Sequence, residues 1–195
     1  MNFTARDERH LAALQRHWRA ARSFPSMAKM ASVVGLSSSA SVFGLVGRLV
    51  DAGFLSRVDG RLAPTRRFFS YRLLGPVRAG VPEEAPQGGE FETLNAEDFL
   101  VRHPDRTSYA TVRGDSMSGV GLLDGDIVVV EHNTAARPGD VVVAVVDDRI
   151  TVKTLILEGD SFVLRAANPN YADIRPGASL EVLGVVVGSF RRMRR

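Results

Sequence analysis

The hydrophobic pattern of this 195-residue sequence changes its period along the chain. In the first third, apolar residues recur at helical spacing, as in Val42, Leu45, Val46, Leu49 and Val50. After residue 107, apolar residues gather in short runs that Gly, Asp, Asn and Pro interrupt, which is typical of β-strands. The sequence therefore predicts a helical part followed by a separate β-rich part.

Three helices are predicted in the first third. Serines at positions 26 and 37–39 can cap the second and third helices, and Gly35 can end the second because glycine accepts a positive φ. Two short extended runs then flank Asp59-Gly60, which is a typical hairpin turn. Helix, turn, helix and hairpin in this order indicate a winged helix-turn-helix.

Six short strands are predicted in the second part, and their number and spacing favour a mostly antiparallel, barrel-like sheet. We therefore expect an α+β multidomain chain: a winged helix-turn-helix at residues 1–64, a linker at 65–73, and a β domain at 74–195. The predicted strands are Thr107–Val112, Asp126–Glu131, Asp140–Val146, Ile150–Leu157, Ser161–Arg165 and Leu180–Ser189.

The charge of the sequence is divided in the same way. Residues 1–72 contain 12 of the 25 Lys and Arg residues but only 4 of the 22 Asp and Glu residues, a net charge of +8, whereas the remainder carries −5. A basic first part is expected to bind a polyanion such as DNA. The alternative is a three-helix interaction module whose basic face is merely solvated. The predicted DNA contacts are Lys29, Ser38, Ser39, Ser41, Phe43, Arg48, Arg57 and Arg61.

Composition excludes several classes of protein. The sequence contains no cysteine, which rules out disulfides, thiol nucleophiles and cysteine-based zinc sites. The N-terminus is too charged for a secretory signal, and the longest apolar run, Val141–Val146, is too short to span a bilayer. We therefore expect a cytoplasmic protein without a membrane segment, and the sequence indicates no metal or organic cofactor.

Two residues of the β-rich part could carry out chemistry together. Ser116 follows a predicted strand, and Lys153 lies within one. A serine hydroxyl is a poor nucleophile until a base removes its proton, and a lysine can be that base only if burial keeps its amine neutral. The alternative for each residue taken alone is an ordinary turn serine and a solvent-exposed strand lysine.

The context of these two residues resembles a known family. Gly114-Asp115-Ser116-Met117, Asp124-Gly125-Asp126, Gly139-Asp140-Val141-Val142 and Thr151-Val152-Lys153 occur in this order. This set, with the spacing from Ser116 to Lys153, resembles the peptidase domain of the LexA/UmuD family of self-cleaving proteins, from about Leu73 to the C-terminus. The resemblance implies Ser116 as nucleophile, Lys153 as general base and Ala79-Gly80 as the scissile bond.

The resemblance also implies a biological role. The chain would repress SOS genes by binding operator DNA as a homodimer joined through its C-terminal domain, in our interpretation through the strand Leu183–Phe190. An activated RecA filament would stimulate its self-cleavage. The alternatives are a UmuD-type translesion polymerase accessory protein, against which the basic first part argues, and a phage-type cleavable repressor. A signal-peptidase-like enzyme shares the Ser/Lys chemistry but generally needs a membrane anchor.

Overall fold

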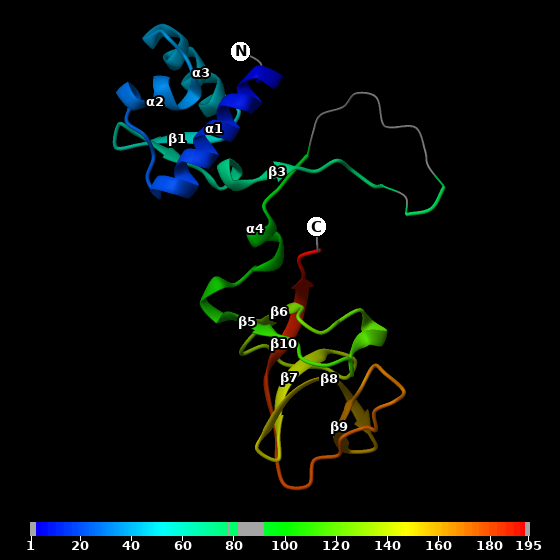
Figure 1. Cartoon of the computed structure of the whole chain (residues 1–195). Coiled ribbons are helices and arrows are strands. Elements are labelled where there is room, and N and C mark those ends of the chain that lie inside the picture. Colours follow the sequence, from blue (N-terminus) through cyan, green and yellow to red (C-terminus); the bar gives the residue numbers. More distant parts are fainter. Residues whose placement is uncertain (1–2, 78, 82–91, 194–195) are drawn as a thin grey trace. The chain divides into compact units, whose positions relative to one another are not determined.

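The structure is a computed structural model that describes residues 3–77, 79–81 and 92–193. The chain forms two compact units, Met1–Ala96 and Glu97–Arg195 (Figure 1). The first unit is mainly helical and the second is built on a β-sheet, as the change of hydrophobic period predicts. Each unit has its own hydrophobic core: among the described residues, one apolar cluster in the first unit and two in the second.

Three helices form the core of the first unit, and each begins at a side-chain cap. Thr4, Ser26 and Ser38 accept hydrogen bonds from the first turns of their helices, which satisfies backbone N–H groups that have no partner within the helix. The apolar stripes of the three helices face one another around buried Leu14 and Met30. The helices are α1 (Ala5–Ala21), α2 (Met27–Val34) and α3 (Ser39–Asp51).

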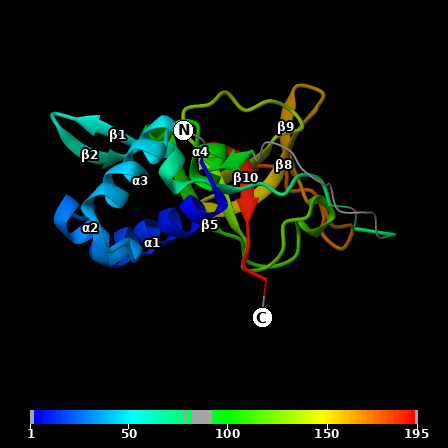
Figure 2. The ribbon, with the colours of Figure 1, turned by 90° about the horizontal axis from the view of Figure 1, so that it is seen from above.

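A hairpin follows the helices. Strands β1 (Leu55–Val58) and β2 (Arg61–Pro64) pair around Asp59-Gly60, where both residues have positive φ, and Figure 2 shows this hairpin beside the helices. The 3-10 helix η1 (Arg66–Phe69) comes next and buries Phe68 completely in the helical core. The predicted linker at 65–73 thus contains a core residue, and the division at residues 64 and 74 stays a prediction.

Two very short strands complete the first unit. Strand β3 (Tyr71–Arg72) pairs antiparallel with β4 (Thr93–Leu94), and the Leu73 N–H donates to the Glu92 carbonyl. Arg19 of α1 anchors Tyr71 through a hydrogen bond to its hydroxyl and a cation–π contact with its ring. This pairing joins the two ends of the segment 73–92.

A buried ion pair connects α1 to α3. The Asp7 carboxylate is 1% exposed and accepts hydrogen bonds from Nε and Nη2 of Arg48, the closest at 2.7 Å, and from the hydroxyl and backbone N–H of Thr4. These donors, the Arg48 guanidinium first, lower the pKa of Asp7 from 3.8 to about 2. The capping carboxylate of one helix therefore fixes the position of another.

The second unit is a six-stranded antiparallel sheet. A short helix α4 (Ala96–Leu100) and the turn η2 (Pro104–Arg106) precede it. All six strands lie within two residues of their predicted ends, and their order in the sheet is β5-β6-β10-β7-β8-β9. The strands are β5 (Thr107–Thr111), β6 (Ile127–Glu131), β7 (Val141–Val146), β8 (Arg149–Glu158), β9 (Ser161–Arg165) and β10 (Leu180–Phe190).

The last strand, β10, lies inside the sheet and pairs with two neighbours over different parts of its length. Its first half pairs with β7 as far as Val185, and its second half, Val185–Phe190, pairs with β6. The side of Val186–Phe190 opposite β6 therefore has no partner strand among the described residues.

The helices of this protein are short. Within residues 3–77, 79–81 and 92–193, no single helix is long and apolar enough to cross a membrane. Helices α2 and α3 would pass only as a pair, by length and composition, and they meet at a bend of 90°.

We expect Asp7→Asn to destabilise the first unit by about 2 kcal/mol at neutral pH, the free energy that corresponds to lowering the pKa of Asp7 from 3.8 to about 2. Because the folded pKa lies below the unfolded one, this stabilisation is complete above pH 4 and disappears as the pH falls towards 2. Urea unfolding followed by the fluorescence of Trp18, the only tryptophan, measures it. Glu8→Gln, on the same helix turn but exposed, is the control, and equal unfolding midpoints for the two variants would contradict the prediction.

Candidate active site

Lys153 lies in the middle of β8 and is buried, with 7% of its surface exposed. Side chains alternate along a strand, so Thr151 and Leu155 share its face. Leu155 is 2% exposed, and Val142, the partner of Lys153 on β7, is completely buried. The Lys153 side chain thus lies on the buried face of β8, beside apolar residues.

Ser116 lies in the turn between β5 and the 3-10 helix η3 (Ser118–Val120). The structure brings it to Lys153, from which it is separated by 37 positions in the sequence: the amine Nζ is 2.8 Å from the Ser116 hydroxyl oxygen. The same nitrogen lies 3.2 Å from the Thr151 hydroxyl oxygen and 3.0 Å from the Val152 carbonyl oxygen.

Burial lowers the pKa of Lys153 from its ordinary value of 10.5, because the ammonium loses its hydration. No carboxylate of the described residues forms an ion pair with it to offset that loss. A neutral amine has two N–H donors and one lone pair. The ammonium can donate to all three oxygens, and after deprotonation the neutral amine can still donate to Thr151 and Val152 and accept from the Ser116 hydroxyl.

The edge of β8 beside Lys153 is open. Strand β7 pairs with Arg149–Thr154, whereas β9 pairs only with Thr154–Glu158. No strand of the described residues covers the other side of residues 149–153. An extended peptide could therefore pair with this edge through its main chain and present a peptide bond beside Ser116.

A second segment holds the Ser116 turn in place. The Asn168 amide donates to the Asp115 carbonyl at 3.1 Å, and the Tyr171 hydroxyl donates to the Asp115 carboxylate, which raises the pKa of that tyrosine. Asn168 is itself 9% exposed. Sequence reasoning noticed Asn168-Pro169-Asn170-Tyr171 only as part of a family resemblance, because its contact with Asp115 spans more than 50 residues.

Gly119 makes the closest approach between the two segments. Its N–H donates to the Ala167 carbonyl oxygen at 2.7 Å, and a Cβ placed on Gly119 would lie 2.2 Å from that oxygen. Backbone cannot yield as a flexible side chain does, so only glycine fits here. The turn that carries Ser116 is thus fixed against a neighbouring loop through main-chain atoms.

The predicted scissile residues belong to the first unit. Ala79 and Gly80 are both exposed and lie in the segment between β3 and β4. A Cβ on Gly80 would meet no atom within 4 Å. The flanking Arg78 and Pro82 lie outside the described residues.

The predicted DNA contacts lie on the helices and the hairpin of the first unit, and all but one are exposed. The exposed ones are Lys29, Ser38, Ser39, Ser41, Phe43, Arg57 and Arg61. Arg48 differs because it is half-buried and its guanidinium is bound to Asp7. Sequence reasoning missed this partner, since a contact between residues 41 positions apart leaves no local signal.

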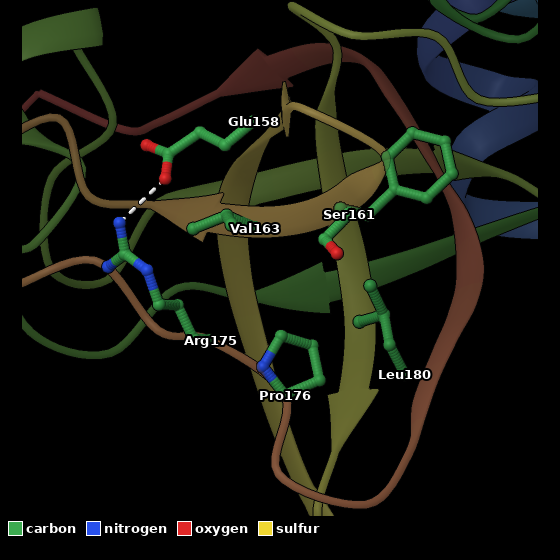
Figure 3. A pocket seen from close by; sticks show the side chains of 7 residues that line it. Glu158, Ser161, Val163, Arg175, Pro176 and Leu180 are labelled. Carbon is green, nitrogen blue, oxygen red and sulfur yellow. Dashed lines mark hydrogen bonds and ion pairs between the residues drawn. The ribbon is translucent and has the colours of Figure 1, made fainter.

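A cavity of about 550 Å³ lies away from Ser116 and Lys153, between the β8–β9 hairpin and the loop that precedes β10. Figure 3 shows the Glu158–Arg175 ion pair on its rim, with Val163, Pro176 and Leu180 lining the apolar part. Within the described parts of both units, no group of three or more His, Asp or Glu side chains could hold a metal ion.

Comparison with known proteins agrees with this geometry. Residues 72–187 match the family described as peptidase S24-like, which covers the whole sheet except its last residues. The chain is 33% identical to the LexA repressor of Anaeromyxobacter dehalogenans over 188 residues, which cover 94% of this chain and 80% of that protein. It is 34% identical to the LexA repressors of Pelotomaculum thermopropionicum and Opitutus terrae, over 190 and 178 residues that cover 87% and 88% of both chains. The chain therefore belongs to the peptidase S24-like family, as a LexA-like repressor.

We expect Gly119→Ala to slow self-cleavage by about 100-fold, because displacing this turn moves the Ser116 hydroxyl away from the Lys153 amine. The rate is measured from the appearance of fragments on denaturing gels at alkaline pH. Val120→Ala, at the neighbouring exposed position, is the matched control and should cleave at the rate of the unmodified protein. Unchanged cleavage in Gly119→Ala would show that the turn is not held as described.

Proposed function

We propose that this LexA-like repressor responds to DNA damage, binds operator DNA as a homodimer, and inactivates itself by cutting its own chain at Ala79-Gly80. The observation that carries the proposal is the 2.8 Å contact between the Lys153 amine and the Ser116 hydroxyl, in a setting that favours the neutral amine. Supporting it are the open edge of β8 and the exposure of the Ala79-Gly80 segment.

In the proposed reaction, the Ser116 hydroxyl gives its proton to the neutral Lys153 amine while its oxygen attacks the Ala79 carbonyl carbon. When the tetrahedral intermediate collapses, the Lys153 ammonium returns the proton to the Gly80 nitrogen, and the C–N bond breaks. The chain is then held as an Ala79 ester on Ser116. Lys153 next takes a proton from water, whose oxygen attacks the ester carbon, and the Lys153 ammonium then returns this proton to the Ser116 oxygen as the ester bond breaks.

The first unit is proposed to bind DNA as a winged helix-turn-helix, with α3 in the major groove and β1–β2 as the wing. Its basic charge supports this, as does the exposure of Lys29, Arg57 and Arg61, which can contact phosphates. Arg48 has a different role in this proposal, because its pairing with Asp7 fixes α3 within the unit. The LexA repressors named above match 87–94% of this chain, which favours a repressor over a UmuD-type accessory factor.

The proposed dimer joins two copies through β10. The unpartnered side of Val186–Phe190 can pair with the same segment of a second copy, because an antiparallel pair is compatible with two-fold symmetry. Val187 and Phe190, which are 48% and 41% exposed, would be covered. The two-fold axis would then place two DNA-binding units on two operator half-sites.

Cleavage is proposed to release the operator by separating the DNA-binding units from the dimer that joins them. Once Ala79-Gly80 is cut, each DNA-binding unit holds a single half-site and loses the avidity of the dimer. Because the chain is a LexA-like repressor, we propose an activated RecA filament as the partner that stimulates the cut, and the cytoplasm as the compartment.

We expect the rate of self-cleavage, without any partner, to rise with pH and to reach a plateau with a midpoint below 10.5, because the active form has a neutral Lys153 and burial lowers its pKa. Lys153→Ala should abolish cleavage and leave operator binding intact. Lys29→Ala is the matched control for cleavage alone, since Lys29 is the only other lysine of the chain and is exposed, but is itself a proposed phosphate contact. Cleavage of Lys153→Ala at the original rate would refute the Ser/Lys assignment.

Val187→Lys is expected to convert the dimer to a monomer, because a charge at the paired edges would be buried without a partner. Light scattering after size-exclusion chromatography measures the mass. Leu157→Lys is the control, because Leu157 is 50% exposed but lies on β8, away from the proposed interface. A dimeric Val187→Lys protein would place the interface elsewhere.

A further inference from the structure

One large aromatic side chain on α3 lies in solvent. Phe43 is 60% exposed, although the other apolar side chains of the middle of this helix, such as Val42 and Leu45, are almost completely buried. Phe43 makes no ring contact with another aromatic residue of the described part of the chain. It lies within the first two turns of α3, the part of a recognition helix that reaches base edges.

Three polar side chains of α3 and its N-cap, Ser38, Ser41 and Arg48, are engaged within the protein. Arg48, its only basic residue, is bound to Asp7. The Ser38 hydroxyl accepts from the Ser41 N–H at 3.1 Å and donates to the Ser41 hydroxyl oxygen at 2.8 Å, so these two serines mainly cap the helix. The largest exposed side chain at the start of α3 is therefore the apolar ring of Phe43.

The basic charge of the first unit indicates which kind of molecule binds at Phe43. Lys29, Arg57 and Arg61 are exposed on neighbouring elements of a unit that is strongly basic, so the surface suits DNA better than an apolar protein partner. The major groove displays one apolar group, the C5 methyl of thymine, and a phenylalanine ring is one of the side chains that contact it.

We propose that Phe43 is a specificity-determining residue that recognises the C5 methyl group of a thymine in each operator half-site. The proposal rests on the proposed DNA-binding function and narrows it: at this position the protein reads a methyl group rather than a hydrogen-bonding edge. Thymine is then preferred to cytosine because cytosine lacks the methyl, and 5-methylcytosine is bound better than cytosine.

The test begins with full-length protein carrying Ser116→Ala, which prevents cleavage and leaves the first unit unchanged. This protein selects duplexes from a random library, and the enriched duplex is then synthesised with each thymine replaced in turn by deoxyuridine, which lacks only the methyl. We expect one replacement in each half-site to weaken binding by about fourfold, the effect of one buried methyl group. Fluorescence anisotropy measures the dissociation constants.

Phe43→Ala in the same background completes a double-mutant cycle. Because it removes the ring from both copies of the dimer, it should bind the thymine duplex about as weakly as the Phe43 protein binds a duplex with deoxyuridine in both half-sites, and it should not distinguish the two duplexes. Phe43→Leu should retain part of the discrimination between thymine and deoxyuridine. When the base pair at that position is replaced by 5-methylcytosine and guanine, the protein should bind this duplex more tightly than the one with unmethylated cytosine, but only when Phe43 is present. Trp18 fluorescence confirms that each variant is folded.

The outcomes separate the two proposals. If no duplex is enriched, DNA binding itself is refuted, and the inference with it. If a duplex is enriched but the protein binds deoxyuridine and thymine equally at every position, or if Phe43→Ala keeps the full discrimination, the inference alone is overturned. A Phe43→Ala variant that changes only the oligomeric state would also overturn it, because the ring would then be a protein contact.

Discussion

The second unit depends on a lysine amine that is buried and forms no ion pair with any carboxylate of the described residues. Burial deprives the ammonium of its hydration, so the pKa of Lys153 lies below its ordinary value and the amine loses its proton more easily than that of a lysine in water. A neutral amine 2.8 Å from a hydroxyl is able to take its proton. The sheet supplies this environment through its pairing register, since the partner of Lys153 is the fully buried Val142.

The position of Ser116 is fixed in a different way. Ser116 lies in a turn, where no strand register fixes its position, and its neighbours are instead tied to the segment 167–171. The Gly119–Ala167 approach leaves no room for a Cβ, and Asp115 is held by Asn168 and Tyr171. Lys153 and Ser116 are thus positioned by independent parts of the same unit.

Hydrophobic period predicted most of the fold, because it is a local property of the sequence. Helices α2 and α3 follow the N-caps Ser26 and Ser38, which lie among the predicted capping serines, and the six strands of the sheet match the predicted runs closely. Contacts that join distant positions left no such signal. The Asp7–Arg48 ion pair and the Asn168–Asp115 contact each combine ordinary polar residues that only the folded chain brings together. The proximity of Ser116 and Lys153 could be expected only because neighbouring motifs resembled a family.

The short pairing of β3 with β4 bears on what a cut at Ala79-Gly80 would produce. The break would leave Tyr71 and Arg72 on one fragment and Thr93 and Leu94 on the other, so two strands that now belong to a single molecule would become a complex of two. An intramolecular ladder this small survives because its ends are held at high effective concentration. After the cut, the effective concentration of β3 and β4 would fall to the concentration of the free fragments. The two strands would then dissociate, and the fragments would separate.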